Sequence, residues 1–153
     1  MTVVRRDILT NLKTTLEGIP VAAGYATGIK KVERVHRPPE DPPAEQQRPW
    51  IGYMVGPTER ETQPFGEIRC TMNVWLLAYL SPKSDDEHED LVAQLEDDLV
   101  VALMKDQSRG GKATSTTLGP GESNEGFPQV GTRVGEYVEQ LRIVYFRSAT
   151  VST

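Results

Sequence analysis

Cysteine and long apolar runs are scarce in this chain of 153 residues. Its one cysteine, Cys70, has no second thiol to pair with, which excludes a disulfide framework and favours a reducing compartment such as the cytoplasm. The longest apolar stretch, Val74 to Leu80, is far shorter than the roughly 20 residues that span a bilayer. Residues 1–19 lack the apolar block of a signal sequence. We therefore expect a soluble protein that neither crosses nor binds a membrane.

Basic charge is also in short supply. The chain has 17 lysines and arginines against 22 aspartates and glutamates, which gives a formal net charge of −5. This sign is unfavourable for a protein that coats phosphate backbones, so we expect DNA at most as passing cargo. Hydrophobic residues make up 37% of the chain, within the globular range. The length favours one domain over residues 1–153.

Residues suited to catalysis are few. The two histidines, His36 and His88, have no evident catalytic partner in the sequence and fit surface or packing roles. Cys70 belongs to the apolar face of an expected strand, where a thiol behaves as a small hydrophobe. Gly110, Gly111 and Lys112 lack the spacing and the setting of a phosphate loop. We therefore expect no enzymatic activity and no cofactor.

One acidic cluster has two interpretations. Carboxylates surround His88 between residues 85 and 90, and hard oxygen ligands of this kind could bind a divalent cation in an enzyme or a binding module. Ser84 followed by Glu87 also fits a capping box, and acids favour the first turn of a helix. The helix start explains the cluster without a metal and is the preferred interpretation.

Apolar periodicity predicts two helices and five strands. Val4, Ile8, Leu12 and Leu16 recur every fourth residue in a first helix, and Leu91, Leu95, Leu99 and Leu103 do so in a second that runs from Ser84 to Asp106. Strands are expected over 28–36, 50–55, 68–80, 113–118 and 134–147. The order is helix, three strands, helix and two strands. It predicts an α+β fold in which a mainly antiparallel sheet of four to five strands packs against two helices.

Two of these strands end with apolar residues on both faces. Two helices can fully cover only one face of a sheet, so the remaining apolar side chains need another surface. They are Trp75, Leu77, Tyr79, Val144 and Phe146. Self-association would supply that surface. Cover by a helix or a long loop of the same chain would supply it equally well, and both explanations stay open at this point.

Three polar segments are expected to connect the elements: Arg37–Pro49, which is rich in proline, Gly56–Gly66 and Gln107–Arg133. Loops of this length are frequent sites of contact. They carry Arg60, Arg109 and Arg133, which we include with the apolar residues above as candidates for an interface with another copy or a partner. Solvation is the alternative role for such basic residues.

The chain resembles the tail terminator (tail completion) proteins of long-tailed bacteriophages in the order of its elements and in their residue patterns. The resemblance covers nearly the whole chain, from the first helix and the segment around Tyr25 to the closing strand. The segments that carry it are KKVERV at 30–35, RPWIGYMV at 48–55, NVWLLAYL at 73–80, DDEHEDLVAQLEDDLVVALMKD at 85–106 and EYVEQLRIVYFR at 136–147. Other neck, head-closure and connector proteins have a similar element order and similar residue patterns.

The resemblance implies an α+β subunit without catalytic residues that forms a ring, expected to be a hexamer, on the finished tail tube. Such a ring ends tube growth and forms the joint to the head connector. The implied partners are other copies of the chain, the tail tube protein and a connector or neck protein. The implied location is the virion, at the tail end or neck, after assembly in the host cytoplasm. The three polar segments are then expected to make the contacts.

Overall fold

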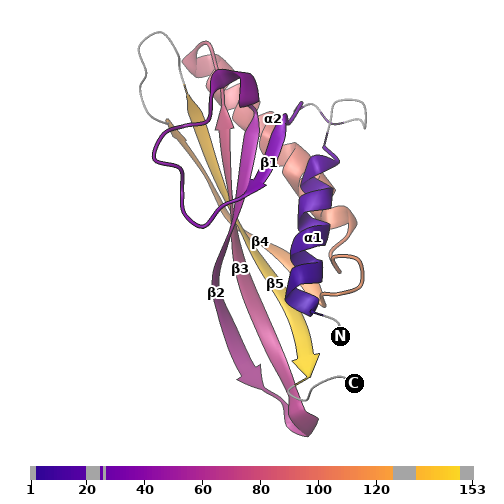
Figure 1. Cartoon of the computed structure of the whole chain (residues 1–153). Helices are drawn as coiled ribbons and strands as arrows, with labels where there is room; N and C mark the ends of the chain where they lie inside the picture. The colour runs from indigo at the N-terminus through magenta and orange to yellow at the C-terminus, as the bar shows by residue number, and fades with distance from the viewer. Residues whose placement is uncertain (1–2, 20–24, 26, 126–133, 149–153) are drawn as a thin grey trace.

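The computed structural model describes residues 3–19, 25, 27–125 and 134–148. Within these residues the chain forms two α-helices and five β-strands, and the predicted α+β fold is confirmed (Figure 1). In chain order the elements are α1 (Val4–Glu17), β1 (Lys31–Arg34), β2 (Trp50–Thr62), β3 (Glu67–Leu80), α2 (Asp85–Lys105), β4 (Ser115–Glu125) and β5 (Gly135–Ser148). Short 3₁₀ turns cover Glu45–Gln47 and Pro64–Gly66.

The strands form one sheet in the order β1-β2-β3-β5-β4. β1 runs parallel to β2, and the other three neighbouring pairs are antiparallel. β1 pairs with β2 only from Trp50 to Tyr53. Among the described strands, none therefore borders this edge of β2 between Met54 and Thr62. Within this edge Pro57 has no backbone N–H, and its carbonyl accepts a hydrogen bond from the Asn73 amide at 3.0 Å.

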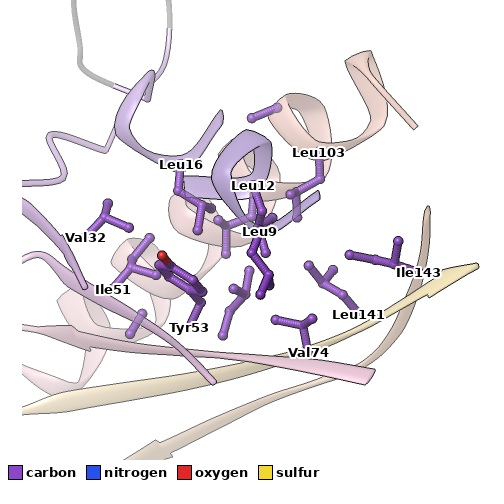
Figure 2. Close-up of a cluster of buried hydrophobic side chains, with 14 of the residues drawn as sticks. Leu9, Leu12, Leu16, Val32, Ile51, Tyr53, Val74, Leu103, Leu141 and Ile143 are labelled. Atoms are coloured by element: carbon purple, nitrogen blue, oxygen red, sulfur yellow. The ribbon is translucent and has the colours of Figure 1, made fainter. Parts of the chain in front are cut away.

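Both helices pack on one face of the sheet, here called the inner face. Every second residue of β3 from Cys70 to Leu80 points to this side and is buried, as strand geometry dictates. Figure 2 shows Leu9, Leu12 and Leu16 of α1 and Leu103 of α2 above the side chains of the sheet. Those sheet residues include Ile51, Tyr53, Val74, Leu141 and Ile143. The opposite side of the sheet, the outer face, has no helix on it among the described elements.

The second helix begins as the sequence predicts. The Ser84 hydroxyl oxygen accepts a hydrogen bond from the backbone N–H of Glu87 at 3.1 Å. This bond satisfies one of the donors that a helix start leaves free. The capping residue is therefore confirmed, and acids of the 85–90 cluster lie in the first turns of α2.

The expected connection Gly56–Gly66 is much shorter in the structure. β2 continues to Thr62, and Thr58–Thr62 pairs with Ile68–Met72 after a register shift at residues 55–58. The residues Glu59, Arg60 and Glu61 are all exposed. Because both faces of this part of the strand meet solvent, no apolar alternation marked it in the sequence.

The segment Gln107–Arg133 also contains more strand than the sequence predicts. β4 extends to Glu125 instead of ending at Leu118, and its pairing with β5 shifts register between Leu118 and Gly121. Glycine and proline at 119–121 indicated a loop, yet an edge strand accommodates such an irregularity because one of its sides needs no partner. Residues 126–133 of the predicted segment lie outside the described part of the chain.

Candidate functional site

A small apolar cluster forms on the outer face around Trp50 and Tyr79. Their ring centroids lie 5.6 Å apart at 45°, and Leu77 and Val134 complete the cluster. The indole Nε1 of Trp50 donates a hydrogen bond to the Glu33 carboxylate at 2.8 Å. A hydrogen bond from Lys31, and then the one from Trp50, lower the pKa of Glu33. Leu77 and Tyr79, two of the five predicted interface residues, are thus buried within the chain itself.

The proline-rich segment Arg37–Pro49 folds beside this cluster. The guanidinium of Arg48 is buried and donates to the carbonyl of Pro43 at 2.8 Å and to the Ser81 hydroxyl at 3.2 Å. The Ser81 bond ties the segment to the end of β3, and the Pro43 bond links two parts of the segment itself. A pocket of about 380 Å³ remains between the segment and Trp50. Most of this polar segment is exposed, and Arg48 is its buried anchor. Buried guanidinium donors require hydrogen-bond partners, and Pro43 and Ser81 supply them.

The other three predicted apolar residues lie further along the outer face. Val144 is buried, Trp75 is half-buried and Phe146 is 40% exposed. The Trp75 indole lies against Gly56, where an added Cβ would come within 3.1 Å of its Nε1. Of the five predicted apolar residues, only Phe146 and part of Trp75 therefore stay open, and cover by the same chain accounts for the other three.

The most exposed apolar side chain in the described residues lies elsewhere. Phe65 stands in the turn between β2 and β3 and is fully exposed, with a relative accessibility of 103%. Thr58–Thr62, the turn and Glu67–Thr71 form a hairpin, here called the arm, whose tip extends beyond both helices (Figure 1). Its base stays in the domain, because Cys70 is buried in the core and Thr58 accepts a hydrogen bond from Arg5 of α1. Arg60 lies exposed on this arm. A lone phenylalanine in a polar segment gave no periodic signal, so sequence reasoning missed Phe65.

Arg109 is completely buried, and its side chain caps the C-terminal end of α2. Its guanidinium donates to the backbone carbonyls of Leu103 and Asp106, which the helix end leaves without intrahelical partners. Burial lowers the pKa of Arg109, and the nearby carboxylate of Asp106 opposes this shift. Arg109 therefore lies inside the fold and not on a surface that a partner can reach. Arg133, the remaining basic candidate, lies outside the described residues.

The surroundings of Asp106 link the two helices. Its carboxylate accepts hydrogen bonds from Ser108 Oγ at 2.9 Å and from the backbone N–H of Gly110 at 2.7 Å. Asn11 of α1 donates a third at 3.4 Å. The pKa of Asp106 is lowered, and the hydrogen bond from Ser108 is the largest cause. This arrangement holds α1 against the end of α2.

The described side chains of the acidic cluster at 85–90 form no arrangement of metal ligands. Among the described side chains, no group of three or more His, Cys, Asp or Glu residues is placed to hold an ion. His88 is buried against Gly135, where an added Cβ would lie 2.9 Å from its Nε2. His88 thus packs in the interior, between the first turn of α2 and the start of β5.

A buried polar pair on β5 was not expected from the sequence. Tyr137 donates its hydroxyl to the carboxylate of Glu139, and both side chains face the interior. Burial raises the pKa of Glu139, the Tyr137 bond opposes the shift, and the charge of Glu96 adds to it. Gly121 of β4 leaves room for the pair, because a Cβ there would come 2.3 Å from the Tyr137 hydroxyl. The alternation of β5 puts Glu139 inside, although its charge argued for a surface position.

Comparison with known proteins yields no assignment. The chain matches no family model, and no curated protein has a significant sequence match. No helix in the described part of the chain is long and apolar enough to cross a membrane. Among the surfaces described above, the arm with Phe65 is the most distinctive.

Proposed function

We propose that this protein is a structural component of a long-tailed bacteriophage virion, the tail terminator. Copies of the chain assemble as a ring, expected to be a hexamer, on the end of the tail tube. The ring ends tube growth and forms the joint to the head connector or another neck protein, while DNA passes through as cargo. The single observation that carries this proposal is the arm, which holds Phe65 out in solvent beyond the body of the domain.

Phe65 favours an assembly function because of its exposure. Full burial of an aromatic side chain contributes about 1.5–3 kcal/mol, and none of this is gained when the side chain stands in water. Contact with another protein surface would gain it. Large aromatic side chains commonly act as anchors at protein interfaces.

The sheet gives further support. The free edge from Met54 to Thr62 belongs to β2, the strand that leads into the arm. The exposed Phe146 lies on β5, which pairs with β3 beside the arm. An interface with another copy would cover such an edge. Contacts between two different surfaces of identical subunits produce closed rings when the rotation closes, which is the geometry that a tube cap requires.

The direct test is a tube-growth assay. Tail tube protein from the same virus is polymerised with increasing amounts of this chain, and tube lengths are measured by negative-stain electron microscopy. We expect shorter tubes that carry a ring-shaped density at one end. Unchanged lengths and bare ends would overturn the proposal.

A second experiment distinguishes a tail terminator from the main alternative, another neck or head-closure protein. The chain is mixed with purified head connectors and, separately, with preformed tubes. A terminator binds tube ends and stops their elongation. A head-closure protein binds the connector and leaves tube growth unaffected.

A further inference from the structure

We propose that an acidic face of α2 in one copy docks on a basic edge of the sheet in a neighbouring copy. The acidic face consists of five exposed carboxylates: Asp86, Glu89, Asp90, Glu96 and Asp97. The basic edge consists of four exposed cationic side chains in and beside β1: Lys30, Lys31, Arg34 and Arg37. This contact rests on the self-assembly proposed above and identifies the two surfaces that meet.

The acidic face carries charge of one sign. Each of its members lies three, four or seven residues from another, which places them on one side of the helix. No lysine or arginine occurs between residues 86 and 97. Like charges four residues apart, such as Asp86 and Asp90, repel each other, and the helix dipole favours acids only in the first turn. Glu96 and Asp97 lie well beyond that turn, so cations from another molecule would relieve a repulsion that the helix itself does not.

The basic edge lies along β1, the outermost strand of the sheet. Its far side borders none of the described strands. Among the described residues, only Lys31 of the four cations has an ion pair, with Glu33 at 2.9 Å. The Glu33 carboxylate also accepts the hydrogen bond from the Trp50 indole. Four cations against one carboxylate give this edge a positive charge, although the chain as a whole has a net charge of −5.

The two surfaces face different directions within one copy. Asp98 of α2 accepts a hydrogen bond at 2.6 Å from the backbone N–H of Thr27, which precedes β1, so this flank of the helix faces the β1 side. Residues of a helix follow each other at about 100°, so Glu89 and Glu96 point roughly half a turn away from Asp98. No ion pair in the described part of the chain joins the acidic face to the basic edge. Contact between these unlike surfaces therefore passes from copy to copy and produces a ring when the rotation closes.

The two surfaces also agree in length. The helix rises about 1.5 Å per residue, so Asp86 and Asp97 lie roughly 17 Å apart along it. The chain from Lys30 to Arg37 spans at most roughly 23 Å at about 3.3 Å per residue. Val101 is 42% exposed one turn beyond Asp97 and adds apolar surface on the same side of the helix. The charges then set the orientation and register of the two copies.

Zero-length crosslinking tests the contact in the wild-type protein. A water-soluble carbodiimide joins a lysine amine to a carboxylate only where the two groups touch, and a mixture of isotope-labelled and unlabelled chains shows which adducts link two copies. We expect such adducts between Lys30 or Lys31 and the acidic face. Lys13 and Lys112, which are exposed outside the basic edge, are the controls and should give none. Absence of the expected adducts, both in the protein alone and in the protein mixed with tubes, would overturn the proposal.

Charge exchange between the surfaces gives a second test. One variant carries Lys30→Glu, Arg34→Glu and Arg37→Glu, and the other carries Glu89→Lys, Asp90→Lys and Asp97→Lys. None of these six side chains has an ion pair with a described residue, so both variants should fold, which thermal melting checks. Each variant alone should associate at least about tenfold more weakly than the wild type.

An equimolar mixture of the two variants should regain association. In the mixture each reversed surface meets a surface of opposite charge on the other chain. The control variant Glu17→Lys, Asp41→Lys and Glu45→Lys makes the same change in charge at exposed positions outside both surfaces and should associate no more weakly than the wild type. Undiminished association of either reversed variant, or no recovery in the mixture, would overturn the contact. A basic edge that binds DNA instead would show the first of these outcomes, together with weaker DNA binding by the edge variant.

The tube-growth assay distinguishes failure of this contact from failure of the proposed function. If both reversed variants cap tubes as the wild type does, the function stands and the contact is wrong. If the adducts and the recovery in the mixture appear but tubes grow unchecked, the contact stands and the function is wrong. If the wild type neither caps tubes nor gives the adducts, both proposals fall.

Discussion

The indole Nε1 of Trp50 lies 2.8 Å from the carboxylate of Glu33, on the parallel pair of strands that begins the sheet. This bond fixes the ring that lines the pocket. The substitution Glu33→Ala should lower the free energy of unfolding by about 0.5–1.5 kcal/mol. Urea titration measures the loss, and Glu45→Ala, at an exposed position in the proline-rich segment, is the control. Equal stability of the two variants would contradict this role of Glu33.

The same bond gives a pH dependence. The pKa of Glu33 is lower in the folded chain than in the unfolded one, chiefly through Lys31 and then Trp50. Its contribution to stability is therefore present above the unfolded pKa, about 4.3, and is lost as the pH falls through the folded value. The difference in stability between wild type and Glu33→Ala should shrink over that acidic window.

Glu139 should behave in the opposite way. Burial raises its pKa, so the folded chain holds the proton more tightly than the unfolded chain. Its favourable contribution is complete below the unfolded pKa and is lost as the pH rises through the raised folded value. Glu139→Gln should then be more stable than the wild type at pH 7 by about 1 kcal/mol and lose that advantage in acid. Glu61→Gln on the exposed arm is the control. A destabilised Glu139→Gln at pH 7 would contradict this account.

Gly52 offers a test of the packing around Trp50. A Cβ at this position would lie 2.5 Å from Cη2 of the Trp50 ring, so Gly52→Ala must displace the indole. We expect a loss of about 1–3 kcal/mol and a shift in tryptophan fluorescence. Gly18→Ala is the control, since its Cβ would meet only backbone oxygens at 3.4 Å. Wild-type fluorescence and stability in Gly52→Ala would show that the indole is not held as described.

Substitutions of Arg109 show whether this residue stabilises the fold or contributes to an interface. Arg109→Ala leaves the carbonyl of Leu103 without its donor, whereas the carbonyl of Asp106 keeps the backbone N–H of residue 109. We expect a loss of about 1–3 kcal/mol in the free energy of unfolding of the monomer. Arg109→Lys should restore only part of it, because lysine lacks the planar fork of donors. If Arg109→Ala weakened association and left monomer stability unchanged, Arg109 would be an interface residue after all.

The sequence allowed prediction of the elements that bury one regular face. The stripe of α1 and the alternation of β3 reflect the periods of helix and strand, and both reach the inner face in the structure. The arm was missed because Glu59, Arg60 and Glu61 are exposed on a strand that has no buried face there. Backbone pairing alone extends such a strand, and pairing leaves no mark on the order of apolar residues.

The candidate interface was only partly accessible to sequence reasoning. An apolar residue such as Tyr79 needs cover, but nothing in its own segment indicates that the anchored Arg37–Pro49 segment lies beside its cluster. The position of Arg109 depends on carbonyls that become available only when α2 ends. Phe65 is a single residue whose importance lies in its exposure and its φ, and both are properties of the folded chain.

The proposed function requires that copies of this chain assemble into a closed ring. Light scattering coupled to gel filtration, followed by negative-stain imaging of the protein alone and with tail tubes, tests it most directly. We expect closed rings of several copies, free in solution or at tube ends, and their loss in Phe65→Asn. A wild-type protein that stays monomeric both alone and in the presence of tubes would contradict it.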